Sequence, residues 1–197
     1  MSNSLRLYSS SQFFINFQSY EPKERYLGLN QTHSNHITTT KSLGKNKMGE
    51  DGIIFSATET KMITIKTADC MPICYIGERY IGLIHAGWRG VKSEIYLKPE
   101  LKKIKPSIIV VGPSICNKCF EVSEDFQREF PSHLTRFKKL NNRLFFELKS
   151  LVKDKLSHNF PFSRIKIIDD CTLCNEKWHS YRRNKTSERN FTIFQKQ

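Results

Sequence analysis

Four short runs typical of β-strands follow one another between residues 52 and 84, and they constrain the fold more than any other feature of the chain. Each run is rich in β-branched or aromatic residues and is separated from the next by turn-forming residues. Gly77 and Glu78, which separate the last two runs, suit a tight hairpin turn. The four runs are GIIF at 52–55, MITIK at 62–66, PICYI at 72–76 and RYIGLI at 79–84.

Further strands and helices surround this β-rich block. The apolar patterns predict strands at residues 12–17, 25–29, 107–111 and 164–168. They predict helices within 87–104, broken at Pro99, then from Ser123, which offers a cap before early acids, and over 145–156. The polar segment 39–51 is typical of a loop. We therefore expect an α+β fold in a single domain, residues 1–197, with mixed or antiparallel sheets flanked by helices.

The chain is strongly basic. It holds 32 Lys+Arg against 19 Asp+Glu, a net charge of +13, and its apolar fraction of 38% includes 14 Phe. Such a charge attracts anions, including phosphates, nucleotides and nucleic acid. A lysine-rich solvated surface also explains it, and no nucleic-acid-binding motif accompanies the charge, so we do not expect nucleic acid as a partner.

No segment approaches the roughly 18 apolar residues of a membrane span. The N-terminal residues 1–20 are interrupted by polar side chains and do not form the apolar core of a signal peptide. We therefore expect a soluble cytoplasmic protein that does not bind a membrane, with its six cysteines as reduced thiols.

Three segments each deliver a possible metal ligand close to the end of a strand. QTHSN carries His33, TADC carries Cys70 and HAGWRG carries His85. Two imidazoles and a thiolate form a common zinc set, and three protein ligands leave a fourth position for water or substrate. A lone His or Cys is more often structural, and sequence spacing alone does not bring these three together.

The neighbours of these residues suggest further roles. Asp69 could orient a ligand histidine or hold a substrate hydroxyl, or simply cap the turn after its strand. Arg89 lies between Gly87 and Gly90, where a ligand can approach closely, and its guanidinium could bind phosphate. The alternative for Arg89 is a salt bridge to Asp69 or Glu94.

Two CxxC pairs, Cys116–Cys119 and Cys171–Cys174, suggest a second, structural zinc site. The interval between the pairs is longer than in ordinary zinc ribbons, so four separate thiols are the alternative. Cys74 lies in the apolar run MPICYI and is expected in the core.

Other polar residues have weaker support from the sequence. His36 forms HxxH with His33, but on an irregular segment it is a loop residue or a substrate contact. Arg182, Arg183 and Arg189 form a basic cluster that could hold phosphate or pair with Asp169 and Asp170.

Four motifs taken in order, TADCMPI, IGLIHAGWRGV, GPSI with CFEV, and CT with SYRR and ER, resemble the YfiH-like family. The resemblance runs from about Gln31 to Arg189. The family is described both as polyphenol oxidase, with a multicopper laccase domain, and as purine nucleoside phosphorylase with adenosine deaminase activity. The resemblance implies a fold similar to bacterial toxin deamidases that use Cys and His, and a zinc site at His33, Cys70 and His85.

The chain departs from the family pattern in two places. Family members usually carry a longer N-terminal region before the Q-x-H motif, so this YfiH-like domain has a shortened one. Substrate contacts from that region are then absent or come from a partner subunit of an oligomer. The usual Tyr of the YEV motif is Phe120 here, which removes a hydroxyl.

These observations lead to one main functional hypothesis. As the resemblance implies, a zinc enzyme would split adenosine or inosine with phosphate into base and ribose 1-phosphate, and would also deaminate adenosine. Catalysis would involve Cys70, His85, Arg89 and Asp69, and substrate would contact Arg89 and His36.

Three alternatives remain open. The first is a copper-dependent polyphenol oxidase, although six scattered histidines are few for a multicopper centre. The second is a Cys-His hydrolase with Cys70 as nucleophile and His85 as base. The third is a non-catalytic anion-binding module.

Overall fold

The structure is a computed structural model that describes residues 3–197. Its centre is a six-stranded mixed sheet with the order β13-β9-β7-β8-β5-β4. Pairs β7/β8, β5/β8 and β7/β9 are antiparallel, whereas β13/β9 and β4/β5 are parallel. The strands span, in that order, Arg164–Ile167, Ile108–Val111, Met71–Ile76, Tyr80–Ala86, Gly52–Ser56 and Ile37–Thr39.

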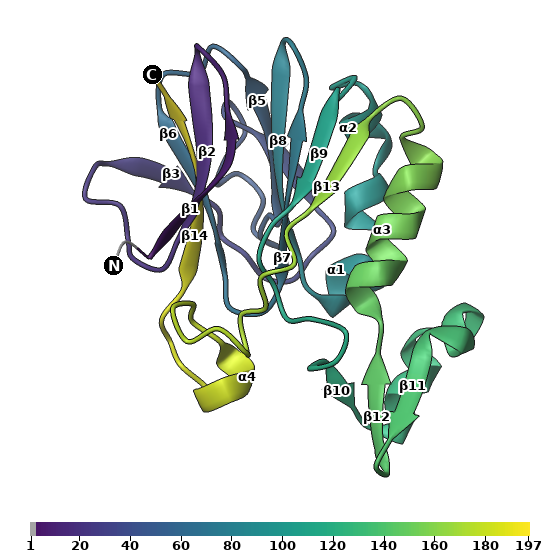
Figure 1. The fold of residues 1–197 in the computed structure, drawn as a ribbon. Coiled ribbons are helices and arrows are strands. Elements are labelled where there is room, and N and C mark those ends of the chain that lie inside the picture. The colour runs from purple at the N-terminus through teal and green to yellow at the C-terminus, as the bar shows by residue number, and fades with distance from the viewer. Residues whose placement is uncertain (1–2) are drawn as a thin grey trace.

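A second sheet of five strands, in the order β1-β2-β14-β6-β3, faces the first (Figure 1). The C-terminal strand β14 is inserted between β2 and β6, so the two ends of the chain share one sheet. Strands β1, β2, β14, β6 and β3 span Ser4–Ser9, Phe13–Gln18, Asn190–Lys196, Met62–Thr67 and Tyr26–Gly28.

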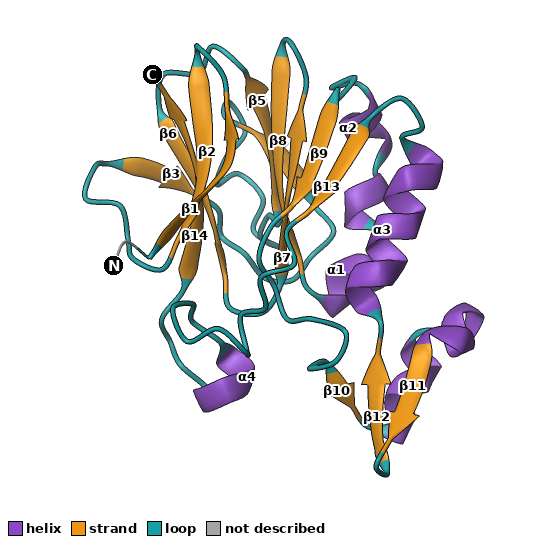
Figure 2. Ribbon diagram, viewed as in Figure 1, coloured by secondary structure: helices purple, strands orange, loops and turns teal. Residues whose placement is uncertain are grey.

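The six-stranded sheet is buried on both faces, which explains why β7 is apolar throughout. Cys74 and Ile76 point into the core shared with the five-stranded sheet, whereas Ile73 and Tyr75 point to the helical side. Cys74 is fully buried, which confirms its expected place in the core. Three α-helices cover the second face, as Figure 2 shows: α1 Trp88–Lys92, α2 Pro99–Lys102 and α3 Leu148–Asn159. The short 3₁₀ helix η1, Ile95–Leu97, joins α1 to α2.

A small third sheet extends below α3 and corrects two sequence-based predictions. It contains β10 Glu121–Val122, β12 Arg143–Phe146 and β11 Phe137–Leu140, with the 3₁₀ helices η2 Glu124–Glu129 and η3 Pro131–Arg136 beside it. The expected helix over 145–156 is wrong at its start, because the last two residues of β12 pair in the small sheet and α3 begins only at Leu148. The helix expected from Ser123 is 3₁₀ rather than α, and the Ser123 side chain does not cap it.

The α+β class with mixed sheets is confirmed, and the expected strands at 12–17, 25–29, 52–55, 62–66, 72–76, 79–84, 107–111 and 164–168 are all present. The hairpin at Gly77 is present, with the Gly77 amide donating to Tyr80 O. Strands β1, β4, β10, β11, β12 and β14 were not predicted, nor was α4, Tyr181–Asn184. Among residues 3–197 no helix is long and apolar enough to cross a membrane.

Candidate metal centre and active-site cavity

The side chains of His33, Cys70 and His85 converge on one point. Their ligand atoms all lie within 4.8 Å of one another. Cys70 Sγ is 3.7 Å from His33 Nε2, and the two imidazole rings are 4.8 Å apart at an angle of 72°. The chemistry of this donor set, two imidazoles and a thiol, fits zinc with a fourth position left open.

Each ligand is delivered by a different part of the chain, and the five-stranded sheet holds two of the segments together. Gln31 exchanges two hydrogen bonds of 2.7 Å with the backbone of Lys66 in β6. This pairing ties the loop that carries His33 to the strand that leads to Cys70. His85 comes from β8, so residues from both large sheets meet at the site.

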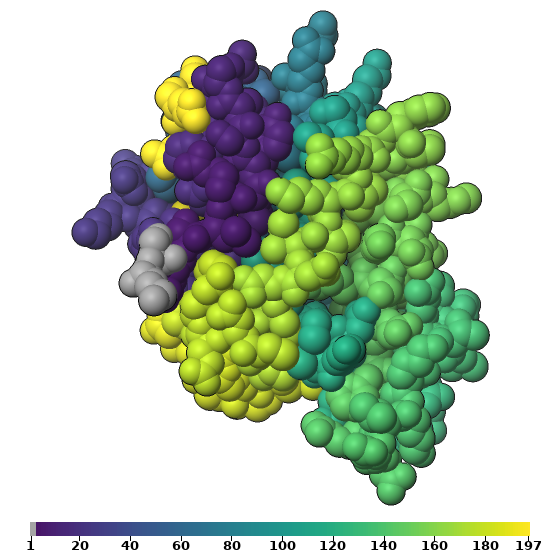
Figure 3. All heavy atoms as spheres, in the orientation of Figure 1, coloured from purple at the N-terminus to yellow at the C-terminus, as the bar shows by residue number. Residues whose placement is uncertain are grey.

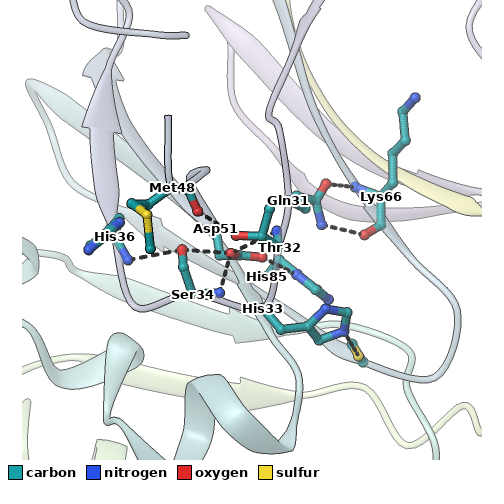
Figure 4. Close-up of polar contacts among 10 residues, drawn as sticks. Gln31, Thr32, His33, Ser34, His36, Met48, Asp51, Lys66 and His85 are labelled. Carbon is teal, nitrogen blue, oxygen red and sulfur yellow. Dashed lines mark hydrogen bonds and ion pairs between the residues drawn. The ribbon is translucent and has the colours of Figure 1, made fainter. Parts of the chain in front are cut away.

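The carboxylate of Asp51 fixes two of the three ligands, as Figure 4 shows. His85 Nδ1 donates to Asp51 Oδ1 over 2.6 Å, so Nε2 is the nitrogen left for a metal. Asp51 Oδ2 accepts from the Ser34 amide at 2.6 Å and from the Thr32 amide at 3.2 Å, on either side of His33. Asp51 is fully buried, and its role was missed by the sequence analysis.

The electrostatics of these side chains favour an ion pair between Cys70 and His85. Desolvation acts to raise the pKa of the Cys70 thiol, but hydrogen bonds from His33 and His85 outweigh it and lower the pKa to about 6. Burial acts to lower the pKa of His85, but hydrogen bonds to Asp51 and Cys70 raise it to about 9. The thiolate form of Cys70 is the one that binds a metal.

Gly87 leaves the space that the ligands occupy. A Cβ atom at this position would lie 2.7 Å from His33 Cδ2 and 3.0 Å from Cys70 Sγ. The backbone at Gly87 has φ −73° and ψ 172°, which any residue can adopt. Glycine is therefore required here for the close approach of His33 and Cys70, not for its backbone freedom.

The three candidate ligands open onto a cavity of about 620 Å³, a volume typical of a small-molecule site. Its apolar lining includes Trp88 and Phe120. One acidic side chain, Asp69, faces it, together with six basic ones: Lys66, Arg89, Lys149, Arg182, Lys185 and Arg189. The cavity therefore attracts anions.

Asp69 joins two walls of this cavity. Its Oδ1 accepts from the Thr172 hydroxyl and its Oδ2 from the Arg182 amide, both over 2.7 Å. The left-handed backbone at Asp69, with φ 83°, turns the carboxylate towards these partners. Asp69 does not orient a ligand histidine, since Asp51 does so instead.

Arg89 is exposed on the cavity wall, and its guanidinium stacks over the Trp88 ring at 4.3 Å. Neither salt bridge considered from the sequence forms: Asp69 bonds to Thr172 and Arg182, and Glu94 pairs with Lys155. Glu94 also lies outside α1, in a left-handed conformation before η1. Arg89 is therefore placed to meet an anion in the cavity.

Other residues singled out in the sequence lie elsewhere. His36 accepts a hydrogen bond from Asn46 over 2.7 Å and does not line the cavity. Arg183 donates to backbone carbonyls, while Asp170 accepts from Asn175, Trp178 and Lys177. The four cysteines of the CxxC pairs lie together, with their sulfur atoms within 4.8 Å of one another.

Residues 11–194 match the family described as multi-copper polyphenol oxidoreductase laccase. A purine nucleoside phosphorylase from Aquifex aeolicus is 32% identical over 184 residues, which cover 90% of this chain and 86% of the relative. A purine nucleoside phosphorylase from Borreliella burgdorferi is 30% identical over 202 residues, and the alignment covers 93% of this chain and 84% of the relative.

Solved structures share the fold. The Neisseria meningitidis protein NMB0706 superposes with a TM-score of 0.80 at 18% identity, covering 98% of this chain and 99% of its own. YlmD from Geobacillus stearothermophilus superposes with a TM-score of 0.72 at 25% identity, covering 89% of this chain and 75% of its own.

Proposed function

The chain belongs to the multi-copper polyphenol oxidoreductase laccase family, and from this premise we propose that it is a zinc-dependent purine nucleoside phosphorylase. The observation that carries the proposal is the opening of a three-ligand site, His33, Cys70 and His85, into a cation-lined cavity. The names of the relatives from Aquifex aeolicus and Borreliella burgdorferi support the same activity. Within residues 3–197 none of the six cysteines is in a disulfide, which fits a reducing compartment, and we place the enzyme in the cytoplasm.

The cavity residues divide into two roles in this proposal. Trp88 and Phe120 offer aromatic surface on which a purine can stack. Arg89, exposed on the wall, binds phosphate and stabilises the charge that develops during transfer. The glycosidic carbon–nitrogen bond breaks, its electron pair goes to the purine, and a phosphate oxygen bonds to the ribose carbon. A bound zinc would supply Lewis acidity and lower the pKa of a water molecule.

Adenosine deamination is a second reaction that we propose for the same site. Water would replace the amino group of adenosine and release ammonia, so the reaction needs no phosphate. The open fourth ligand position next to His33, Cys70 and His85 supports it, because a water molecule there is the usual nucleophile of zinc hydrolases.

The test measures zinc content and turnover on the same purified sample. We expect inosine to yield hypoxanthine and ribose 1-phosphate only with phosphate, and adenosine to yield inosine without it. His33→Ala should remove the zinc bound by His33, Cys70 and His85 and abolish both activities, whereas the exposed His158→Ala is the matched control. Full turnover by His33→Ala would refute the zinc-dependent mechanism.

A metal-free Cys-His hydrolase is the second candidate, because the lowered thiol pKa of Cys70 and the Asp51–His85 pair resemble a nucleophile with an oriented base. Removing zinc with a chelator distinguishes the phosphorylase from the hydrolase. Loss of turnover on zinc removal, with recovery on zinc addition, supports the phosphorylase. Turnover that survives chelation but stops on alkylation of Cys70 supports the hydrolase.

Copper oxidation of phenols is favoured only by the family description. Within residues 3–197 only two clusters of three or more possible ligands occur, and just one contains histidine. A multicopper centre needs many more imidazoles. Oxygen uptake with a phenol by copper-loaded protein, at rates above those for nucleosides, would reverse this ranking.

A further inference from the structure

The second cysteine cluster lies away from the proposed catalytic centre, at the ends of two neighbouring strands. Cys116 and Cys119 follow β9, and Cys171 and Cys174 follow β13, which is parallel to β9. An isolated bridge between Ser114 and Cys171 continues the pairing of these segments. In Figure 3 the yellow-green lobe near the C-terminus accordingly lies against a teal patch from the middle of the chain.

Both CxxC segments are folded as tight turns that direct their two thiols to one side. In the first turn, the amides of Cys119 and Phe120 both donate to Cys116 O at 3.0 Å. In the second, the Asn175 amide donates to Cys171 O at 2.9 Å. The Cys116 amide also donates to Cys171 Sγ at 3.3 Å, a contact that stabilises a thiolate.

Each turn is held in place by side chains that bind no sulfur. Asn117, inside the first turn, accepts from the Lys149 amide at 3.2 Å and donates to Ser150 Oγ at 2.6 Å. The first turn therefore sits at the N-terminus of α3, where the helix dipole favours negative charge. Arg183 donates to the carbonyls of Thr172 and Leu173 at 2.5 and 2.9 Å, which fixes the second turn.

The sulfur positions fit one tetrahedral centre better than disulfides. All four Sγ atoms lie within 4.8 Å of one another, and the Sγ atoms of Cys119 and Cys174 are 3.2 Å apart. A zinc ion with Zn–S bonds of about 2.3 Å holds its four sulfurs a little under about 4 Å apart. A disulfide would join only two of the four and would require about 2.05 Å between them.

We propose that Cys116, Cys119, Cys171 and Cys174 bind a structural zinc ion as four thiolates. The ion clamps the segment that carries Ile115 and Phe120 to the segment that carries Thr172, and all three residues face or support the catalytic cavity. Four protein ligands leave no open position, so this zinc does no chemistry. Its effect on catalysis comes through the shape of the cavity wall.

The first experiment counts metals in reduced, full-length protein by mass spectrometry. We expect two zinc ions per chain in the wild type and one in Cys119→Ser/Cys174→Ser, which alters one thiol of each CxxC pair and neither of them a buried one. His33→Ala should also retain one zinc, and the combined variant none. Should Cys119→Ser/Cys174→Ser keep the zinc content of the wild type, or should iron fill the site, the proposal is overturned.

A second measurement leaves all four cysteines in place. Cobalt is added to metal-free wild type and to metal-free His33→Ala, and the visible spectrum is recorded. A tetrathiolate site predicts strong sulfur-to-cobalt charge-transfer bands that persist in His33→Ala. Bands that vanish in His33→Ala, or a thiol count showing disulfides in freshly purified protein, would overturn the proposal. Neither result depends on nucleoside turnover, so the proposed function is tested separately.

Discussion

The carboxylate of Asp51 accepts from His85 Nδ1 at 2.6 Å and, through its other oxygen, from the backbone amide of Ser34 at the same distance. One buried carboxylate thus fixes the orientation of the His85 ring and the conformation of the loop that carries His33. The backbone reinforces this, because the His85 amide donates to Asp51 O at 2.7 Å. Asp51 is a positioning residue for the metal centre as a whole.

Asp51→Asn should weaken zinc binding. The amide keeps the size of the side chain, but it has one acceptor oxygen in place of two, so either His85 or Ser34 loses its acceptor. Loss of such an outer contact typically costs about 10- to 100-fold in metal affinity. The unpaired buried donor should also lower the free energy of unfolding by about 1–3 kcal/mol. Zinc competition titration and denaturant unfolding measure the two effects.

The matched control for Asp51→Asn is Glu50→Gln. Glu50 is equally buried, and its Oε1 accepts from the amides of Gly44 and Asn46, which glutamine can still do. Zinc affinity should stay at the wild-type value in Glu50→Gln. If both variants bind zinc equally weakly, the effect comes from a general disturbance of residues 44–52 rather than from loss of the hydrogen bond between Asp51 and His85.

The three candidate metal ligands could be recognised from the sequence, but the residue that positions them could not. His33, Cys70 and His85 stand out because each occurs in an unusual local motif close to a strand. Asp51 precedes an ordinary apolar run, and its contact with His85 depends on the register of β5 and β8, which places Gly52 opposite Ile84. Local periodicity does not determine that register.

The same limit explains the strands that were missed. β14 pairs with β2 and β6, from the opposite end and the middle of the chain, and its sequence NFTIFQK looked unremarkable without those partners. Its alternation was a usable signal, since Phe191 and Ile193 lie on one face and Phe194 on the other. The helix predicted over 145–156 begins later than expected for a related reason, because Phe146 belongs to β12 and packs against Phe130 and Phe137.

Gly87→Ala should disturb the metal site. The added methyl group would meet His33 and Cys70 at 2.7 and 3.0 Å, so one ligand must move. We expect reduced zinc content together with lost turnover, measured by mass spectrometry on dialysed protein.

Gly90→Ala serves as the control for this steric effect, because it lies in the same segment. Its new methyl group would lie 3.2 Å from Ile95 and an ordinary 3.7 Å from the backbone oxygen of His85, and neither His33 nor Cys70 is among its nearest neighbours. It should retain zinc. Normal zinc content in Gly87→Ala would show that the site tolerates the methyl group and that Gly87 has another role.

Asp69→Asn should reduce turnover without loss of zinc. Asparagine tolerates the left-handed backbone at this position, and its oxygen can still accept from Thr172. Its nitrogen cannot accept from the Arg182 amide, so the start of α4 is released from the cavity wall. We expect a higher KM for nucleoside, and Thr172→Val, which breaks the other contact, should shift KM in the same direction. If Asp69 instead reacts with substrate, kcat should collapse in Asp69→Asn alone.

Arg89→Ala should raise the KM for phosphate while leaving zinc content unchanged. The Arg89 guanidinium lies over the Trp88 ring, exposed to the cavity and away from the carboxylates of Asp69 and Glu94. A hydrogen bond to a charged group contributes about 1.5–3 kcal/mol, which corresponds to a loss on the order of tenfold to a hundredfold. Arg89→Lys should recover part of the affinity, because lysine keeps the charge but lacks the planar fork.

Two controls make the phosphate prediction specific. Arg128→Ala removes an exposed arginine that pairs only with Asp125 and lies outside the cavity lining, so it tests whether loss of one positive charge anywhere lowers phosphate affinity. The KM for nucleoside, measured at saturating phosphate, tests whether Arg89→Ala damages the whole cavity. If only the KM for phosphate rises, and only in the Arg89 variants, Arg89 binds the phosphate. If the KM for phosphate is unchanged in Arg89→Ala, other cations of the cavity bind the phosphate. Arg182 and Arg189 are then the next residues to replace.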